Sequence, residues 1–378
     1  MSGLELPLLE YPFGWQVSPL ADEVDEGSYR WGLERGIYCL GDPGEYRGTR
    51  VGWLAAWTAP DATPAGLRLL ADWQMWLFAF DDGFCDESEH GACPSTMIRR
   101  VVDFLGVLEA GPDDFRTGHA TDTNTDTNTD TDTDTNTDTD TDTDRDTDAD
   151  TEAPLAQPPP AGAESRRDVE ARFRGVLGEL GVRVRERATG FQQARFLAAV
   201  QGYFMSQCWE AANRSAAGAG GAPPSPAEYV RMRRHSGAVR TCIALTDVAA
   251  GFELSADDYD DPEVVALTDM AVDVACWAND IMSYPKEVAR SSVVHSLPAV
   301  LGSWRDLDPQ EALWVAARMH DDQVERYLAA ERPVRARASE PLRRYLDGLR
   351  FWMSGNLAWS LETGRYPRDG VLEGRGHG

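Results

Sequence analysis

Lysine is almost absent from this chain of 378 residues. One lysine, Lys286, stands among 36 basic residues, and all the others are arginine. Lysine carries a compact, strongly hydrated point charge, whereas arginine presents a planar fork of donors, so the two residues bind anions differently. A lysine kept at a single position therefore marks Lys286 as a candidate functional residue. The alternative interpretation is a chance lysine on a solvated helix face.

Positive charge as a whole is also scarce, because the formal net charge is −27. A nucleic-acid partner would require basic patches, so we expect none. Part of the imbalance is local. Residues 121–152 contain 12 Asp, one Glu and one Arg, a net charge of −12 that leaves −15 for the rest of the chain.

Paired cysteines and long apolar runs are lacking too. The six cysteines are scattered without a paired framework, which is typical of free thiols in a reducing cytoplasm. Cys85 and Cys93 flank His90, but no second cysteine pair follows, which argues against a zinc site. No apolar run approaches the length of a membrane helix, and no basic segment precedes an apolar core at the N-terminus. We therefore expect a cytoplasmic protein without a signal peptide or membrane insertion.

Stretches of alternating polar and apolar residues, typical of β-strands, are nearly absent, whereas helical periodicity recurs through most of the chain. The pattern becomes helical from Asp22 onward. Longer helices are predicted near 64–82, 95–109, 167–188, 190–213, 226–252, 263–287, 309–330 and 338–363. The sequence therefore predicts an all-α fold, a helical bundle whose apolar and aromatic faces turn toward a shared interior.

Residues 111–165 interrupt this pattern. The Thr-Asp and Thr-Asn repeat at 121–148 cannot contribute to a core, and its like charges keep it expanded. Three consecutive prolines at 158–160 favour an extended polyproline conformation. We predict a disordered, low-complexity insertion between two helices. A calcium-binding role for the repeat would require the EF-hand spacing, which is missing.

Three oxygen-bearing side chains follow one another at a spacing of four in the C-terminal half. Asn279, Ser283 and Glu287 fall on one helix face and drift by only about 40° per step. A carbonyl, a hydroxyl and a carboxylate form a hard-oxygen set that suits Mg²⁺. Pro285 lies inside this motif and removes one helix hydrogen bond, so we expect the helix to kink or end there.

A second acidic cluster ends the strongly apolar segment from Trp73 to Phe80. Asp82 and Asp86 share a helix face, and Asp81 lies beside them. Adjacent carboxylates repel each other and are tolerated best beside cations. Acidic residues at a helix C-terminus also oppose the helix dipole, so a purely structural origin is disfavoured. The cluster is therefore a second candidate metal site.

Two further groups are candidates for anion binding. Arg233 precedes Asn279 by 46 residues, and the pair Arg365-Tyr366 lies near the C-terminal end. A guanidinium fork and a phenol both suit a diphosphate. Gly237 follows Arg233 by four residues, and a glycine inside a helix costs about 1 kcal/mol relative to alanine, so we expect a break or bend there.

Together these motifs resemble those of the bacterial class I terpene synthases. The match covers the aspartate-rich motif, the Asn-Asp-x-x-Ser-x-x-x-Glu motif with its preceding lysine, the upstream diphosphate-sensing arginine and the terminal Arg-Tyr pair. The helical segments from about 22 to 366 fit the family fold. The resemblance implies a single domain over residues 1–378, built around a central active-site cavity. The insertion at 111–165 is not expected of the family.

The resemblance also implies three Mg²⁺ ions that bridge the diphosphate of a linear isoprenoid. One ion would be held by Asn279, Ser283 and Glu287, and the others by Asp81, Asp82 and Asp86. The diphosphate oxygens would be gripped by Arg233, Lys286, Arg365 and Tyr366. Ser236 would occupy the linker position, and Gly237 the effector position that presents a backbone carbonyl to the cation.

The implied reaction is that of a carbon–oxygen lyase, in which a prenyl diphosphate ionises and the allylic cation cyclises in a dry, aromatic-lined cavity. The resemblance favours farnesyl diphosphate as the substrate. Candidate cavity-lining residues are Phe80, Trp277 and Trp359, although core packing explains each of them equally well. We expect a monomer or a homodimer.

Three alternatives remain open at this point. The first is a diterpene cyclase acting on geranylgeranyl diphosphate, which presents the same head group. The second is a chain-elongating prenyltransferase, but that class carries a second aspartate-rich motif where this chain has the Asn/Ser/Glu type. The third is an inactive acidic binding protein, against which the intact metal motifs argue.

Overall fold

A computed structural model of the chain describes residues 4–39, 43–86, 89–110, 165–290 and 295–363. Within these ranges the regular secondary structure is entirely helical and contains no strand, so the all-α prediction is confirmed. In the same ranges, no helix combines the length and the apolar character needed to cross a membrane.

The bounds of the helices agree with most of the predicted segments. The first half contains α1 (Ala21–Arg35), α2 (Pro43–Thr49), α3 (Val51–Thr58), α4 (Pro64–Phe80), the π-helical turn η1 (Asp81–Asp86), the 3₁₀ turn η2 (Glu89–Ala92) and α5 (Pro94–Glu109). The second half contains α7 (Arg166–Arg185), α8 (Gly190–Gly218), α9 (Pro226–Ser236), α10 (Val239–Ile243), α11 (Thr246–Ala250), α12 (Ala256–Tyr259), α13 (Pro262–Arg290), α14 (Leu297–Arg305), α15 (Pro309–Arg337) and α16 (Glu340–Glu362). The segment predicted as one helix at 226–252 is divided into three, α9 to α11.

Short polar side chains fix where many of the helices begin. The side-chain oxygen of the residue before the helix accepts a backbone N–H of the first turn in α4, α7, α8, α9, α12, α15 and α16. Thr189 before α8 and Asp308 before α15 complete reciprocal capping boxes. These caps satisfy N–H groups that the helix itself leaves unpaired, so the helix starts are encoded locally.

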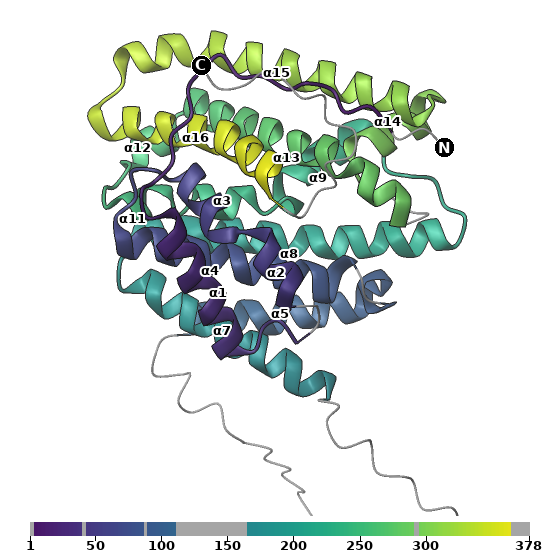
Figure 1. Cartoon of the computed structure of the whole chain (residues 1–378), viewed down its shortest axis with the longest axis horizontal. Helices are drawn as coiled ribbons and strands as arrows, with labels where there is room; N and C mark the ends of the chain where they lie inside the picture. The colour runs from purple at the N-terminus through teal and green to yellow at the C-terminus, as the bar shows by residue number, and fades with distance from the viewer. Residues whose placement is uncertain (1–3, 40–42, 87–88, 111–164, 291–294, 364–378) are drawn as a thin grey trace, which may run out of the picture.

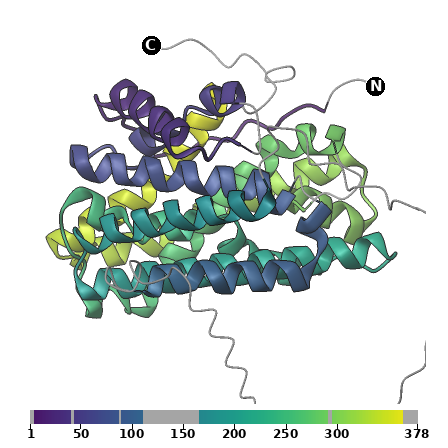
Figure 2. The same ribbon diagram turned by 90° about the horizontal axis from the view of Figure 1, so that it is seen from below.

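The long helices form a bundle around α10, the short helix that follows the break after α9. Figure 1 shows α15 along the top of the bundle, with α13 and α16 beneath it and α8 and α7 below them. Figure 2 shows α4, α5 and α7 running alongside one another, and α7 packs against both of the others. The helix α10 packs against α4, α8, α9, α13 and α16, so it lies in the centre.

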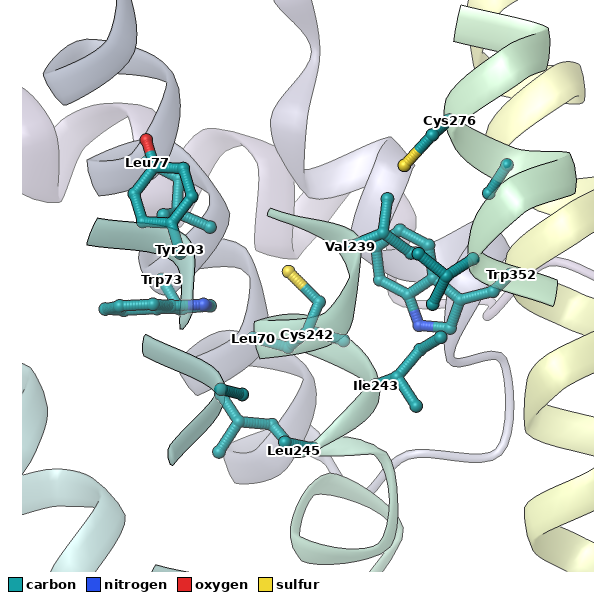
Figure 3. Packing of buried hydrophobic residues seen from close by; sticks show 14 of the residues in the cluster. Leu70, Trp73, Leu77, Tyr203, Val239, Cys242, Ile243, Leu245, Cys276 and Trp352 are labelled. Carbon is teal, nitrogen blue, oxygen red and sulfur yellow. The ribbon is translucent and has the colours of Figure 1, made fainter. Parts of the chain in front are cut away.

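Apolar side chains from four long helices surround this central segment. Figure 3 shows Trp73 and Leu77 of α4 with Tyr203 of α8 on one side, and Cys276 of α13 with Trp352 of α16 on the other. Cys242 of α10 lies between them and is buried. The interior of the bundle is therefore apolar and aromatic, as the sequence predicted.

The helices on either side of the Asp/Thr-rich insertion pack against each other. Arg100 of α5 pairs with Glu170 of α7 at 2.6 Å, and Arg174 of α7 pairs with Asp103 of α5 at 3.0 Å. The insertion therefore connects two helices that pack against each other. Its own predicted disorder falls on residues outside those that the structure describes.

Candidate active site

The two acidic motifs lie at the same end of the bundle. The aspartate-rich turn η1 follows α4, whose opposite end is tied to α11 by a 2.9 Å hydrogen bond from the Thr63 amide to the Ala249 carbonyl. Near the C-terminal end of α8, Arg214 donates to the Gly91 carbonyl of η2 at 3.1 Å. Trp209 of the same helix stacks on His295, just beyond α13, with ring centroids 6.1 Å apart. The end of α8 thus bridges the segments that follow the two motifs.

One continuous helix, α13, carries Asn279, Ser283 and Glu287. The Ser283 hydroxyl donates to Glu287 Oε1 at 2.5 Å, so the two side chains are neighbours across one helical turn. Of the two outcomes expected at Pro285, a kink or an end of the helix, the end is wrong, because α13 continues to Arg290. Proline removes an N–H donor and crowds the preceding turn, but the buried side chains of Met282 and Tyr284 keep this part of the helix packed.

These oxygens fit a magnesium ion by their chemistry. Asn279 Oδ1 accepts Nη2 of Arg233 at 3.0 Å, which turns the amide oxygen rather than the amide nitrogen toward the guanidinium, and an amide oxygen has a second lone pair. Among the described residues, no three His, Cys, Asp or Glu side chains gather as a metal site. The α13 face instead combines one amide, one hydroxyl and one carboxylate, which supply the hard oxygens that Mg²⁺ prefers.

The aspartate-rich motif lies in a widened turn of helix. The π-helical turn η1 continues directly from α4 and contains Asp81, Asp82 and Asp86. Single π-turns occur frequently at functional sites because they re-aim side chains without ending the helix. Asp81 and Asp82 are half-buried. The side chain of Asp86 lies outside the described part of the chain.

Arg233 is held against α13 by a buried carboxylate that was not among the predicted site residues. Asp280 Oδ1 accepts Nε of Arg233 at 2.9 Å and Nη2 at 2.7 Å. Its other oxygen, Oδ2, accepts the Tyr229 hydroxyl at 2.8 Å and the Leu297 amide at 3.0 Å. Tyr229 precedes Arg233 by four residues on α9, and this spacing, which places both on one helix face, could have indicated their connection.

The charges of this pair follow from its burial and its contacts. Burial opposes the charge on Arg233, but the adjacent Asp280 carboxylate outweighs it and holds the pKa of the guanidinium well above its ordinary value. Burial likewise raises the pKa of Asp280, and Arg233 and the Tyr229 hydroxyl oppose that rise. The site therefore keeps a permanent positive charge beside the Asn279 oxygen.

The helix break predicted at Gly237 is present, and its left-handed residue is not the glycine. The helix α9 ends at Ser236 and α10 begins at Val239. Gly237 has an ordinary φ of −69°, and the left-handed residue is Ala238, with φ 60°. A Cβ on Gly237 would lie 2.4 Å from Cys276 Sγ, so close packing on α13 explains this glycine. Beside it, the Ser236 hydroxyl is buried and has no hydrogen-bond partner among the described residues.

The three candidate cavity-lining aromatics occupy different surroundings. Phe80 is fully buried in a cluster of aromatic rings that includes Phe84 and Phe204. Trp277 is buried, and its indole N–H has no hydrogen-bond partner in the described ranges. Trp359 belongs to a separate cluster between α16 and α3, and it donates to the Thr49 carbonyl at 2.8 Å. Their role in a cavity stays a prediction.

The remaining predicted anion-binding residues lie at or beyond the ends of helices. Lys286 is half-buried on α13, directly before Glu287. The helix α16 ends at Glu362, and Arg365 and Tyr366 lie outside the residues that the structure describes. The grip of this C-terminal pair on a diphosphate therefore stays a prediction.

Comparison with known proteins gives a family match and several relatives. A family model described as "Terpene synthase family 2, C-terminal metal binding" matches residues 125–326. The 4-epi-cubebol synthase of Streptosporangium roseum is 31% identical, over 96% of this chain and 92% of the relative. The spiroviolene synthase of Streptomyces violens is 36% identical, over 96% of this chain and 86% of the relative.

Solved structures share the fold. The crystal structure of the SVS_A2 protein, obtained by ancestral sequence reconstruction, is 24% identical and covers 98% of this chain and 93% of its own, with a TM-score of 0.73. Wild-type cucumene synthase is 21% identical and covers 94% of this chain and 100% of its own, with a TM-score of 0.67. At this level of identity, the likeness bears on the helical fold alone.

Proposed function

Because this chain belongs to the bacterial class I terpene synthases, we propose that it ionises farnesyl diphosphate and cyclises the resulting allylic cation to a terpene, with release of diphosphate. The observation that carries the proposal is the contact between Arg233 and Asn279 at 3.0 Å. A guanidinium that can bind an anion touches a helix face that can bind a cation. This combination suits a substrate whose diphosphate is bound together with metal ions.

We propose Mg²⁺ as the metal, with three ions in the complete site. One would be held by Asn279, Ser283 and Glu287 of α13, and the others by the aspartate-rich turn with Asp81, Asp82 and Asp86. Bound Mg²⁺ would supply Lewis-acid stabilisation of the negative charge on the departing diphosphate.

The side chains of the protein itself would hold and orient the diphosphate. Arg233, Lys286, Arg365 and Tyr366 would donate to its oxygens. Donors that are in place before the C–O bond breaks would stabilise the developing charge without reorganisation. The reaction is that of a carbon–oxygen lyase.

The apolar interior around α10 would receive the isoprenoid chain. Trp73 and Tyr203 lie beside α10, and aromatic rings can stabilise a cation without supplying a nucleophile to trap it. The break at Ser236 and Gly237 would turn backbone carbonyl groups toward the same space. Excluding water from this interior lets cyclisation precede quenching.

Farnesyl diphosphate is favoured over other chain lengths by the relatives. The 4-epi-cubebol synthase and the (+)-T-muurolol synthase of Roseiflexus castenholzii are both named as cyclising (2E,6E)-farnesyl diphosphate. They cover 96% and 95% of this chain. Geranylgeranyl diphosphate presents the same head group and is the competing substrate to be tested.

The test is turnover of the purified protein with Mg²⁺ and C10, C15 or C20 prenyl diphosphates, followed by terpene extraction and measurement of released diphosphate. We expect a cyclic C15 product, and we expect Asn279→Ala to abolish nearly all turnover while helicity is retained. Gln310→Ala is the control, because that amide bonds the backbone of Glu5 and not the motif. Near-normal turnover by Asn279→Ala, or by protein stripped with a chelator, would refute the assignment.

A further inference from the structure

Asp280 connects three segments of the bundle through its two carboxylate oxygens. The residue is 1% exposed and lies one position after Asn279 on α13. Oδ1 is occupied by Nε and Nη2 of Arg233, at 2.9 and 2.7 Å. Oδ2 is occupied by the Tyr229 hydroxyl at 2.8 Å and by the Leu297 amide, which belongs to the first residue of α14, at 3.0 Å.

This arrangement determines which donor of Arg233 remains for an anion. Nε and Nη2 both point to α13, where they bind Asp280 and Asn279. The third nitrogen, Nη1, makes no hydrogen bond within the described part of the chain. The Arg233 side chain is 15% exposed, so Nη1 is the donor available to a diphosphate oxygen.

The arginine binds Asp280 in a geometry that it would not adopt by preference. An arginine and a free carboxylate favour a fork in which two nitrogens bind two different oxygens. Here both nitrogens converge on Oδ1, because Tyr229 and Leu297 already fill Oδ2. Without the hydroxyl of Tyr229, Oδ2 keeps one donor, and the carboxylate and guanidinium are free to rotate into the fork.

Tyr229 is suited to this role by its surroundings. It is 1% exposed, and burial raises the pKa of its hydroxyl well above the ordinary value, so it remains a hydrogen-bond donor. The hydroxyl has a single hydrogen to donate, and the charged Asp280 oxygen at 2.8 Å is a nearer and stronger acceptor than the His295 carbonyl at 3.3 Å. No substrate atom needs to touch this side chain.

We propose that Tyr229 is a positioning residue for the diphosphate-binding arginine: its hydroxyl occupies Asp280 Oδ2, which confines Arg233 to Oδ1 and keeps Nη1 directed at the diphosphate. The inference rests on the proposed function, because it assigns Arg233 to the diphosphate. It adds to the residues proposed to touch the substrate a side chain, Tyr229, that orients one of them, Arg233.

The decisive variant is Tyr229→Phe, which removes the hydroxyl and keeps the ring. Inorganic diphosphate with Mg²⁺ serves as the probe, and its dissociation constant is measured by calorimetry beside kcat and KM for the prenyl diphosphate. A hydrogen bond to a charged group supports an effect of about tenfold, so we expect roughly that loss in diphosphate affinity and in kcat/KM.

Tyr327 provides a matched control elsewhere in the bundle. Its hydroxyl, also fully buried, donates to Glu331 at 3.3 Å, and Glu331 pairs with Arg335. Tyr327→Phe therefore removes the same kind of bond from the same kind of ion pair. We expect it to lower the thermal midpoint while leaving diphosphate affinity and kcat/KM unchanged. Equal diphosphate affinities in the two Tyr→Phe variants would overturn the proposal.

A double-mutant cycle tests whether Tyr229 acts through Asp280. Asp280→Asn keeps the shape of the side chain but weakens its hold on the guanidinium. If the proposal holds, the double variant binds diphosphate no more weakly than Asp280→Asn alone, whereas independent roles would make the two losses multiply. The wild-type protein is measured first. If it neither binds diphosphate with Mg²⁺ nor turns over a prenyl diphosphate, the proposed function itself is overturned, whatever the variants show.

Discussion

Lys286 shows at the scale of a single residue why the type of cation matters. It is half-buried and directly precedes Glu287, the last oxygen donor of the α13 motif. An ammonium fits a crowded polyanion as a compact point charge, whereas a guanidinium needs a wide planar approach. The use of lysine here and arginine elsewhere is therefore consistent with a contact to the diphosphate.

This contact predicts an order of activities among variants of Lys286. Lys286→Gln removes the charge and should lower kcat by at least about a hundredfold, in the range found when one fixed donor to a developing anion is lost. Lys286→Arg should fall between glutamine and wild type in steady-state kinetics. Arg318→Gln, on the exposed face of α15, controls for the change in net charge. Unchanged rates in Lys286→Gln would show an ordinary solvated lysine.

At the scale of the element, the two irregularities of the site helices have different origins. Pro285 leaves α13 continuous to Arg290, because one missing hydrogen bond is a local loss within a packed helix. The break after α9 is a change of direction, with Ala238 in the left-handed region between two helices. Gly237 stands beside that residue and is required by the approach of Cys276.

The close approach of Cys276 to Gly237 predicts that Gly237→Ala destabilises the protein, although helix propensity alone would favour alanine. Glycine to alanine near a helix end would ordinarily be neutral or favourable, but the new Cβ would lie 2.4 Å from the thiol sulfur. We expect Gly237→Ala to lower the free energy of unfolding by about 1–3 kcal/mol, the usual cost of overpacking, and to reduce turnover.

A second substitution identifies the cause. Without the sulfur, the nearest atoms to the new Cβ would be the Arg233 carbonyl oxygen at 3.3 Å and Cys276 Cβ at 3.6 Å. Adding Cys276→Ala should therefore recover part of the lost stability in denaturant titrations, so that the two changes are not additive. Strictly additive losses would mean that the sulfur is not what excludes a side chain at this position.

At the scale of the whole molecule, the packing of α5 against α7 sets the distance that the acidic insertion must span. Arg100 lies opposite Glu170, and the Leu108 carbonyl accepts Arg185 at 3.1 Å, so the two helices run in the same direction. The connection from the end of α5 must therefore return along the helix over about 20 Å, or roughly 13 residues at 1.5 Å each. A much shorter chain than the natural insertion can span that distance.

We accordingly predict that most of the insertion is dispensable. Replacing residues 118–160 by about eight Gly and Ser residues leaves a connection of roughly 20 residues, a length for which a flexible chain has a root-mean-square span of about 25 Å. Turnover and the thermal midpoint should match those of the full chain, because α5 and α7 are held together by their own ion pairs. A large loss of either in a side-by-side assay would mean that the acidic segment docks on the enzyme.

The sequence by itself determined the features that depend on neighbours along the chain. Helical periodicity fixed the all-α class, and capping residues such as Thr189 and Asp308 fixed where helices begin. The spacing of Ser283 and Glu287 already placed them on one face, because a helix brings residues four apart together whatever surrounds it. The break at Gly237 was visible for the same local reason, although its exact geometry was not.

Only the tertiary structure decided which distant residues meet. Tyr229 reaches Asp280 across 51 positions, and Cys276 lies against Gly237 because α13 and α9 pack together. Trp359 donates to the Thr49 carbonyl, which lies 310 residues earlier in the chain, and no sequence pattern predicts the cluster to which this tryptophan belongs. Such contacts depend on how whole helices pack, and the free energy of that packing is shared among many side chains. The chemistry of each motif is therefore local, whereas the orientation of Arg233 within the site is set by the fold.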